Sequence, residues 1–96
     1  MTAPSLSIAR ELGRVLREKK LQLTTAESCT GGLIASSLCA SEDPPEFFGS
    51  GFITYTDEAK IAVLEVSYET IATYTAVSEQ PVKEIAAAAQ RRSGAH

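Results

Sequence analysis

The side chains that could do chemistry lie in two short stretches of this 96-residue chain. In the first stretch, Glu27 and Ser28 are followed, after one cysteine, by Thr30, Gly31 and Gly32. A serine hydroxyl is a candidate nucleophile, and it needs a neighbouring base to activate it. Serine is also a preferred helix N-cap, so a structural role for Ser28 stays open. The carboxylate of Glu27 would repel a phosphate, so it suits a ribose hydroxyl or a backbone amide better.

In the second stretch, Thr54, Tyr55 and Lys60 follow a glycine-led segment. A desolvated lysine can act as general base toward a serine, with tyrosine or threonine hydroxyls in support. We expect Lys60 one turn into a helix, where the N-terminal dipole disfavours a positive charge. A surface position for Lys60 and a core-edge position for Tyr55 are the alternatives without catalysis. The candidate chemistry is a serine nucleophile activated by a lysine.

Other catalytic and metal-binding classes lack the residues they need. The single histidine is His96, the last residue, which argues against a Ser-His-Asp triad. The sequence also contains neither a phosphate-binding P-loop nor a dinucleotide-binding glycine motif. Cys29 and Cys39 do not have the spacing of metal ligands, so we expect no metal and no cofactor. We interpret both cysteines as free, buried thiols, because a free cysteine behaves as a small hydrophobe.

Composition narrows the class of protein further. The chain is 44% hydrophobic and 22% charged, with a net charge of −3 and a pI near 5.1. That balance argues against binding to nucleic acid or to a membrane surface. The first four residues lack the basic and apolar regions of a signal peptide. We therefore expect a cytoplasmic protein whose partner is a small molecule.

Hydrophobic periodicity predicts the elements that must position the two stretches. A helix rich in charge comes first, and two strand-turn-helix units follow it. Such turns lie at the carboxyl ends of parallel strands, where α/β proteins bind ligands. Gly31 and Gly32 fall in the first turn of the second helix, where they would allow close packing or ligand approach. In order, we predict a helix at 4–20, a strand at 21–25, a helix at 30–40, a loop at 41–46, a strand at 49–56, a helix at 58–65, a helix at 68–73 capped by Ser67, and a helix from 79 capped by Ser78.

Two strands are few for a parallel sheet that is covered by helices. The last predicted helix is also not followed by a further parallel strand, as a right-handed crossover would normally require. We therefore expect a single α/β domain over residues 1–96 that is incomplete, or that completes its sheet with another chain.

Three segments together resemble the CinA C-terminal domain family of competence/damage-inducible proteins. They are residues 24–35 (TTAESCTGGLIA), 51–60 (GFITYTDEAK) and 76–79 (AVSE), in the family's order. The resemblance implies a three-layer α/β/α fold, here truncated after its first half, and a homo-oligomer. Active family members are nicotinamide-nucleotide amidohydrolases. The implied reaction converts nicotinamide mononucleotide, a pyridine nucleotide, to nicotinate mononucleotide and ammonia without an obligatory metal.

The resemblance also implies roles for particular residues. Tyr55 and Lys60 correspond to the family's catalytic Tyr and Lys, which relay a proton from the nucleophile to the leaving ammonia. The turn formed by residues 27–32, with Glu27, Thr30, Gly31 and Gly32, would line the nucleotide pocket together with Thr54.

The nucleophile is the point at which this chain departs from the family pattern. Family members carry a Gly-Ser-Ser segment before the second strand, and one of its serines is a candidate nucleophile. Here the segment reads Asp43-Pro44-Pro45-Glu46, which leaves Ser28 and Ser50 as candidates. The alternative is a family member without catalytic activity, acting as a nucleotide-binding or protein-interaction module.

Overall fold

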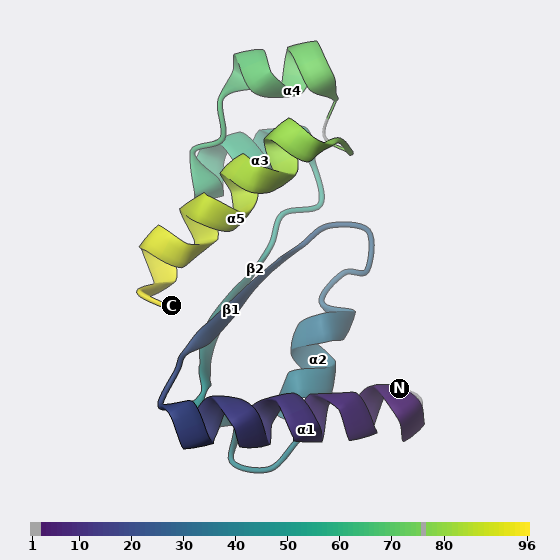
Figure 1. Cartoon of the computed structure of the whole chain (residues 1–96). Coiled ribbons are helices and arrows are strands. Elements are labelled where there is room, and N and C mark those ends of the chain that lie inside the picture. Colours follow the sequence, from purple (N-terminus) through teal and green to yellow (C-terminus); the bar gives the residue numbers. More distant parts are fainter. Residues whose placement is uncertain (1–2, 76) are drawn as a thin grey trace.

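The computed structural model describes residues 3–75 and 77–96. Three residues lie outside the described residues. Met1 and Thr2 belong to the segment that lacks signal-peptide features, and Ala76 is the first residue of the third motif. Figure 1 shows the order of the elements along the chain. They are α1 (Ala3–Lys19), β1 (Leu23–Glu27), α2 (Leu33–Cys39), the 3-10 helix η1 (Pro44–Glu46), β2 (Phe48–Ile53), α3 (Asp57–Leu64), α4 (Tyr68–Tyr74) and α5 (Glu79–Ser93).

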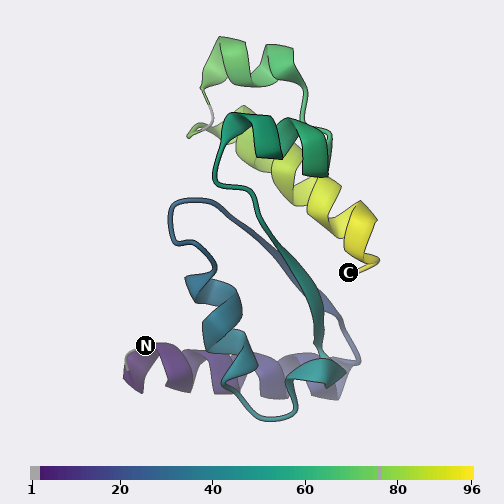
Figure 2. The same cartoon turned by 180° about the vertical axis from the view of Figure 1, so that it is seen from behind.

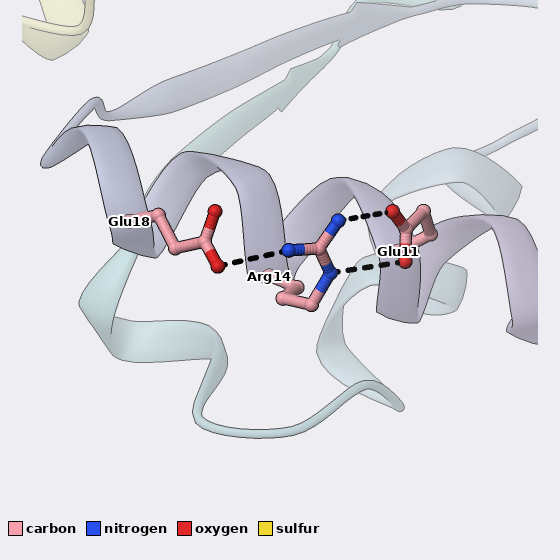
Figure 3. A network of polar contacts seen from close by, with 3 residues as sticks. All are labelled: Glu11, Arg14 and Glu18. Carbon is pink, nitrogen blue, oxygen red and sulfur yellow. Dashed lines mark hydrogen bonds and ion pairs between the residues drawn. The ribbon is translucent and has the colours of Figure 1, made fainter.

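Helix α1 is amphipathic, as its periodicity predicts. Its exposed face carries Arg14, whose guanidinium donates to Glu11 one turn before it and to Glu18 one turn after it (Figure 3). Its inner face packs Ala9 and Leu16 against α2 and Phe47. Ile8 belongs to the same apolar stripe of the sequence but is 69% exposed.

The sheet consists of β1 and β2, paired in parallel. Leu23 pairs with Phe48 and Thr25 pairs with Gly51, so β2 uses three residues where β1 uses two. Side chains alternate between the faces of a strand, and this one-residue shift reverses the alternation in β2. As a result, Phe48 and Phe52 point to opposite faces, although they are four residues apart.

Helices cover both faces of the sheet, which gives the predicted three-layer α/β/α arrangement. On one face, Ala26 and Phe52 pack against a buried cluster from α3, α4, α5 and the segment between α3 and α4. On the other, Leu23 and Phe48 pack against Ala9, Leu38 and Phe47. Figures 1 and 2 show α5 and α2 on opposite sides of the strands. The first cluster consists of Leu64, Val66, Ile71, Ala88 and Ala89.

The turn between β1 and α2 differs from its prediction. Strand β1 continues through Glu27, and α2 does not begin until Leu33. Gly31 and Gly32 therefore precede the helix, with φ angles of 65° and 104° that a helical turn cannot contain. Gly32, not Ser28, is the N-cap residue of α2. The φ of 104° explains the glycine at position 32, and a Cβ there would also lie 2.7 Å from Ile53 Cδ1.

The later turns follow their predictions more closely. Strand β2 ends at Ile53, and Thr56 caps α3 by accepting a hydrogen bond from the Ala59 amide. Ser67 caps α4 in the same way. Ser78 does occupy the N-cap position of α5, but its hydroxyl donates to the Thr75 carbonyl instead of accepting from the helix.

Two smaller predictions were wrong. The segment 41–46 is not all loop, because Pro44 and Pro45 open the short helix η1, where a missing amide hydrogen costs nothing. Cys29 and Cys39 are free but exposed, since one lies in the open turn and the other ends α2. Within the described residues, no helix has the length and apolar character needed to cross a lipid bilayer.

Candidate active site

Lys60 extends from the first turn of α3 into the interior and is only 4% exposed, which excludes a surface position. Its ammonium nitrogen Nζ has oxygen acceptors on three sides. It donates to the Thr54 carbonyl at 2.9 Å, to the Ser28 hydroxyl at 3.2 Å and to the Tyr55 carbonyl at 3.4 Å. None of the ion pairs among the described residues includes Lys60. Within the described residues, the acceptors of its hydrogen bonds are therefore all neutral oxygen atoms.

Ser28 lies directly after β1, where its hydroxyl meets the lysine. Its Oγ accepts from Lys60 Nζ and donates to the Tyr55 carbonyl at 3.4 Å. A lysine that has lost one proton keeps two N–H donors and gains a lone pair. Those donors can remain on the Thr54 and Tyr55 carbonyls, which directs the lone pair at Ser28 Oγ. The geometry is therefore that of a serine nucleophile beside a lysine base.

Glu27 is buried, with an exposed fraction of 5%, and its carboxylate faces the start of α2. One oxygen accepts from the Ile34 amide at 2.7 Å and the Thr30 hydroxyl at 2.8 Å. The other accepts from the Ala35 amide at 3.0 Å and, at 3.5 Å, from the Thr25 hydroxyl. Burial raises the pKa of Glu27, but these hydrogen bonds outweigh it and hold the pKa below its ordinary value.

A cavity of about 320 Å³ opens beside Ser28 and Lys60. Its volume is at the lower end of the range for small-molecule sites. One wall is formed by the carboxyl end of the sheet and the other by α5. Most of the lining is apolar, and Lys60 is its only cationic residue. The lining residues are Thr24, Ala26, Glu27, Ser28, Cys29, Thr54, Lys60, Val77, Val82, Ile85, Ala86 and Ala89.

The structure brings together half of the residues predicted for the site. Glu27, Ser28, Thr54 and Lys60 all line the cavity. Tyr55 contributes its main-chain carbonyl, while its side chain is 69% exposed. The other predicted residues do not line the cavity. They are Thr30, Gly31 and Gly32 in the turn before α2, and Ser50 in β2.

The segment Asp43–Glu46 lies at the other end of β2 from Lys60. It precedes Phe48, the first residue of β2, whereas Lys60 comes after the strand's last residue, Ile53. Within this chain, the segment Asp43–Glu46, where the family resemblance predicted a Gly-Ser-Ser, is therefore not beside the lysine.

Sequence reasoning missed the wall of the cavity that α5 provides. In the sequence, Val82, Ile85, Ala86 and Ala89 form an apolar stripe on the last predicted helix, and such a stripe normally indicates core packing. Ala89 is buried, but Val82 is 54% exposed and borders the cavity. The small side chains of alanine leave space between α5 and the sheet, and this alanine run was the available signal.

Comparisons with known proteins agree with this fold. Residues 5–96 match the family model described as the CinA C-terminal domain. The chain is 48% identical over 89 residues to protein YdeJ of Escherichia coli strain K12, covering 93% of this chain and 52% of YdeJ. It is 42% identical over 89 residues to a putative competence-damage inducible protein of Symbiobacterium thermophilum, covering 93% of this chain and 21% of that protein.

Solved structures show the same similarity. A crystal structure of a CinA superfamily protein from Escherichia coli has a TM-score of 0.93 and 44% identity, and the match covers 99% of this chain and 56% of that one. The crystal structure of the competence/damage inducible protein CihA from Agrobacterium tumefaciens has a TM-score of 0.92 and 37% identity. This match covers 96% of this chain and 56% of that one. The chain thus spans about half the length of YdeJ and of these structures. Because the family match extends over nearly all of its residues, the chain belongs to the CinA C-terminal domain family.

Proposed function

We propose that this chain carries the site of a nicotinamide-nucleotide amidohydrolase, which converts nicotinamide mononucleotide to nicotinate mononucleotide and ammonia. The observation that carries the proposal is the 3.2 Å contact between Ser28 Oγ and Lys60 Nζ at the edge of the cavity. A nucleophile with an adjacent base is the minimum that amide hydrolysis by covalent catalysis requires. The apolar cavity wall from α5 suits the flat pyridine ring of the substrate.

The proposed reaction has two steps. First, Lys60 in its neutral form takes the Ser28 proton while Ser28 Oγ bonds to the carboxamide carbon. The C–N bond then breaks, and Lys60 returns the proton to the departing nitrogen, which leaves as ammonia. Tyr55 acts here through its main-chain carbonyl, which accepts from Lys60 Nζ and from Ser28 Oγ, and not through its exposed phenol. In the second step, water attacks the nicotinoyl ester with Lys60 as base, which regenerates Ser28 and releases nicotinate mononucleotide.

A coupled ammonia assay with nicotinamide mononucleotide tests the proposal. Ser28→Ala and Lys60→Met should each lower ammonia release by about a thousandfold or more, as loss of an activated nucleophile does elsewhere. Ser50→Ala is the matched control, because Ser50 is an exposed serine outside the cavity. It should retain the wild-type rate.

Two results would contradict the proposal in different ways. Loss of activity in Ser50→Ala with retention in Ser28→Ala would assign the nucleophile to the other serine. Absence of turnover, combined with calorimetric binding of the mononucleotide at millimolar concentration, would instead indicate a nucleotide-binding module without catalysis.

A further inference from the structure

Glu27 is a buried carboxylate next to the nucleophile, and the proposed reaction does not use it. We propose that Glu27 is a positioning residue, which holds the turn of residues 28–32 so that Ser28 stays within reach of Lys60. This inference rests on the proposed function and departs from the expectation that Glu27 binds substrate. It concerns how the site is kept assembled before any ligand enters.

The contacts of Glu27 connect the two halves of the site. Its carboxylate accepts from the Ile34 and Ala35 amides, which fixes the start of α2 to the end of β1. Its main-chain carbonyl accepts from the Thr54 amide at 3.0 Å. The Thr54 carbonyl in turn accepts from Lys60 Nζ. Glu27 therefore connects two parts of the site. Its carboxylate holds the start of α2, and its carbonyl holds Thr54, which in turn contacts Lys60.

The turn needs such an anchor because its own backbone restrains it weakly. Gly31 and Gly32 both have positive φ angles, and glycine is the residue with the most backbone freedom. Within the turn, the Gly31 amide donates to the Ser28 carbonyl at 3.1 Å. The Thr30 hydroxyl then attaches the middle of the turn to Glu27. Without the carboxylate, the turn would be held mainly by its two ends.

A carboxylate suits this position better than a neutral acceptor. Each of its oxygens already receives two hydrogen bonds, so little capacity is left for a ribose hydroxyl. Its negative charge also faces the amide groups at the start of a helix, which is a favourable arrangement. In Glu27→Gln, the new amide group would direct its N–H donors at backbone N–H groups and break half of the anchor.

The first test separates positioning from substrate binding. In Glu27→Gln, we expect kcat for ammonia release to fall by about ten- to a hundredfold, because misplacement of a reacting group by about 1 Å has effects of this size. The KM for nicotinamide mononucleotide should change less than about threefold. Glu18→Gln, at an exposed glutamate on α1, is the matched control and should change neither constant. A rise in KM with kcat unchanged would overturn the proposal in favour of ribose binding.

The second test does not depend on activity. Cys29 is exposed and adjoins Ser28, so a trifluoromethyl label on its thiol reports on the turn. Cys39→Ser removes the other exposed thiol. In this background, Glu27→Gln should broaden or split the fluorine resonance, whereas Glu18→Gln should leave it unchanged. An unchanged resonance in Glu27→Gln would overturn the positioning role even if the wild-type protein released no ammonia.

A milder variant covers the case in which Glu27→Gln does not fold. Thr30→Val removes one donor to the carboxylate at an exposed residue, so the fold should survive. We expect the same direction of change in kcat and in the fluorine signal, at a smaller size. A folded Thr30→Val protein with wild-type kcat and signal would contradict the role of this contact.

Discussion

The Lys60 ammonium group donates to two backbone carbonyls and to one side-chain hydroxyl, so its surroundings are mainly backbone. Main-chain carbonyls cannot rotate away as side chains do, so the two that face Nζ fix the direction of the amine. Ser28 supplies the remaining acceptor, and its hydroxyl is the group that can change partner. The sequence predicted the identities of Ser28 and Lys60, because their types suggest a nucleophile and a base. It did not predict the two carbonyls, since every residue has one.

The lowered pKa of Glu27 leads us to expect that the free energy of unfolding depends on pH. Its pKa lies below the ordinary glutamate value of about 4.3, so the stabilisation from its ionised form is complete above that pH and is lost as the pH falls. The difference in unfolding free energy between wild type and Glu27→Gln should therefore be largest above about pH 5 and should narrow on acidification. Urea titrations between about pH 3 and pH 7 measure it.

Glu11 provides the comparison for that experiment. Arg14, through a hydrogen bond and its charge, lowers the pKa of Glu11 as well, but this pair is exposed. Any difference between wild type and Glu11→Gln should disappear in about 1 M salt, which screens surface charges. The Glu27 difference should persist there. If both disappear, the buried hydrogen bonds of Glu27 do not contribute to stability.

The sequence predicted the ends of a long helix more accurately than the ends of a turn. Helix α1 was predicted within one residue at each end, because its charge and apolar pattern repeat over four turns or more. The turn after β1 was predicted less accurately. Strand β1 runs two residues further than the pattern suggested, and α2 starts after Gly32. Leu33 and Ile34 are apolar but exposed, so the apolar residues at the start of α2 do not mark its buried face.

Gly13 in α1 allows a prediction in which helix propensity and packing disagree. Alanine is better than glycine inside a helix by about 1 kcal/mol. A Cβ on Gly13, however, would lie 2.8 Å and 2.9 Å from two ring carbons of Phe47, a side chain with no exposed surface. The overpacking cost of about 1–3 kcal/mol should exceed the propensity gain, so we expect Gly13→Ala to lower the unfolding free energy by up to about 2 kcal/mol.

Phe47→Leu provides the control for that substitution. It removes the ring atoms that the new methyl group would meet, so Gly13→Ala should cost less in this background. A double-mutant cycle from urea denaturation measures the interaction. Equal costs of Gly13→Ala in both backgrounds would show that Phe47 is not the cause.

Among the described residues, the buried apolar side chains form two clusters, one on each face of a two-stranded sheet. The sequence predicted two strands, helices on both sides and the parallel pairing. It could not predict which residues of β2 face which cluster, because the alternation along β2 reverses at the register shift. The cavity was missed for a related reason: α5 belongs to one cluster and also leaves space beside the strands.

The separation of the clusters predicts additive stability effects. Leu38→Ala in one cluster should cost about 2–5 kcal/mol, and Ile71→Val in the other about 0.5–1.5 kcal/mol. Because the sheet lies between the two sites, the double variant should lose the sum of the two, within about 0.5 kcal/mol. Urea denaturation of the four proteins measures this. A clear departure from the sum would mean that the sheet transmits strain from one cluster to the other.

The register shift in β2 also bears on how this strand tolerates changes of length. Substituting Gly49 or Ser50 leaves the backbone path intact, and both residues are exposed. Deleting either one removes the extra residue and leaves Phe48 and Phe52 three positions apart, a spacing that places side chains on opposite faces of a regular strand. Each cluster would therefore keep its aromatic ring. A homologue of this chain can vary in residue type at these positions and can also lack one of them, because a β2 without the extra residue would pair with β1 in regular alternation.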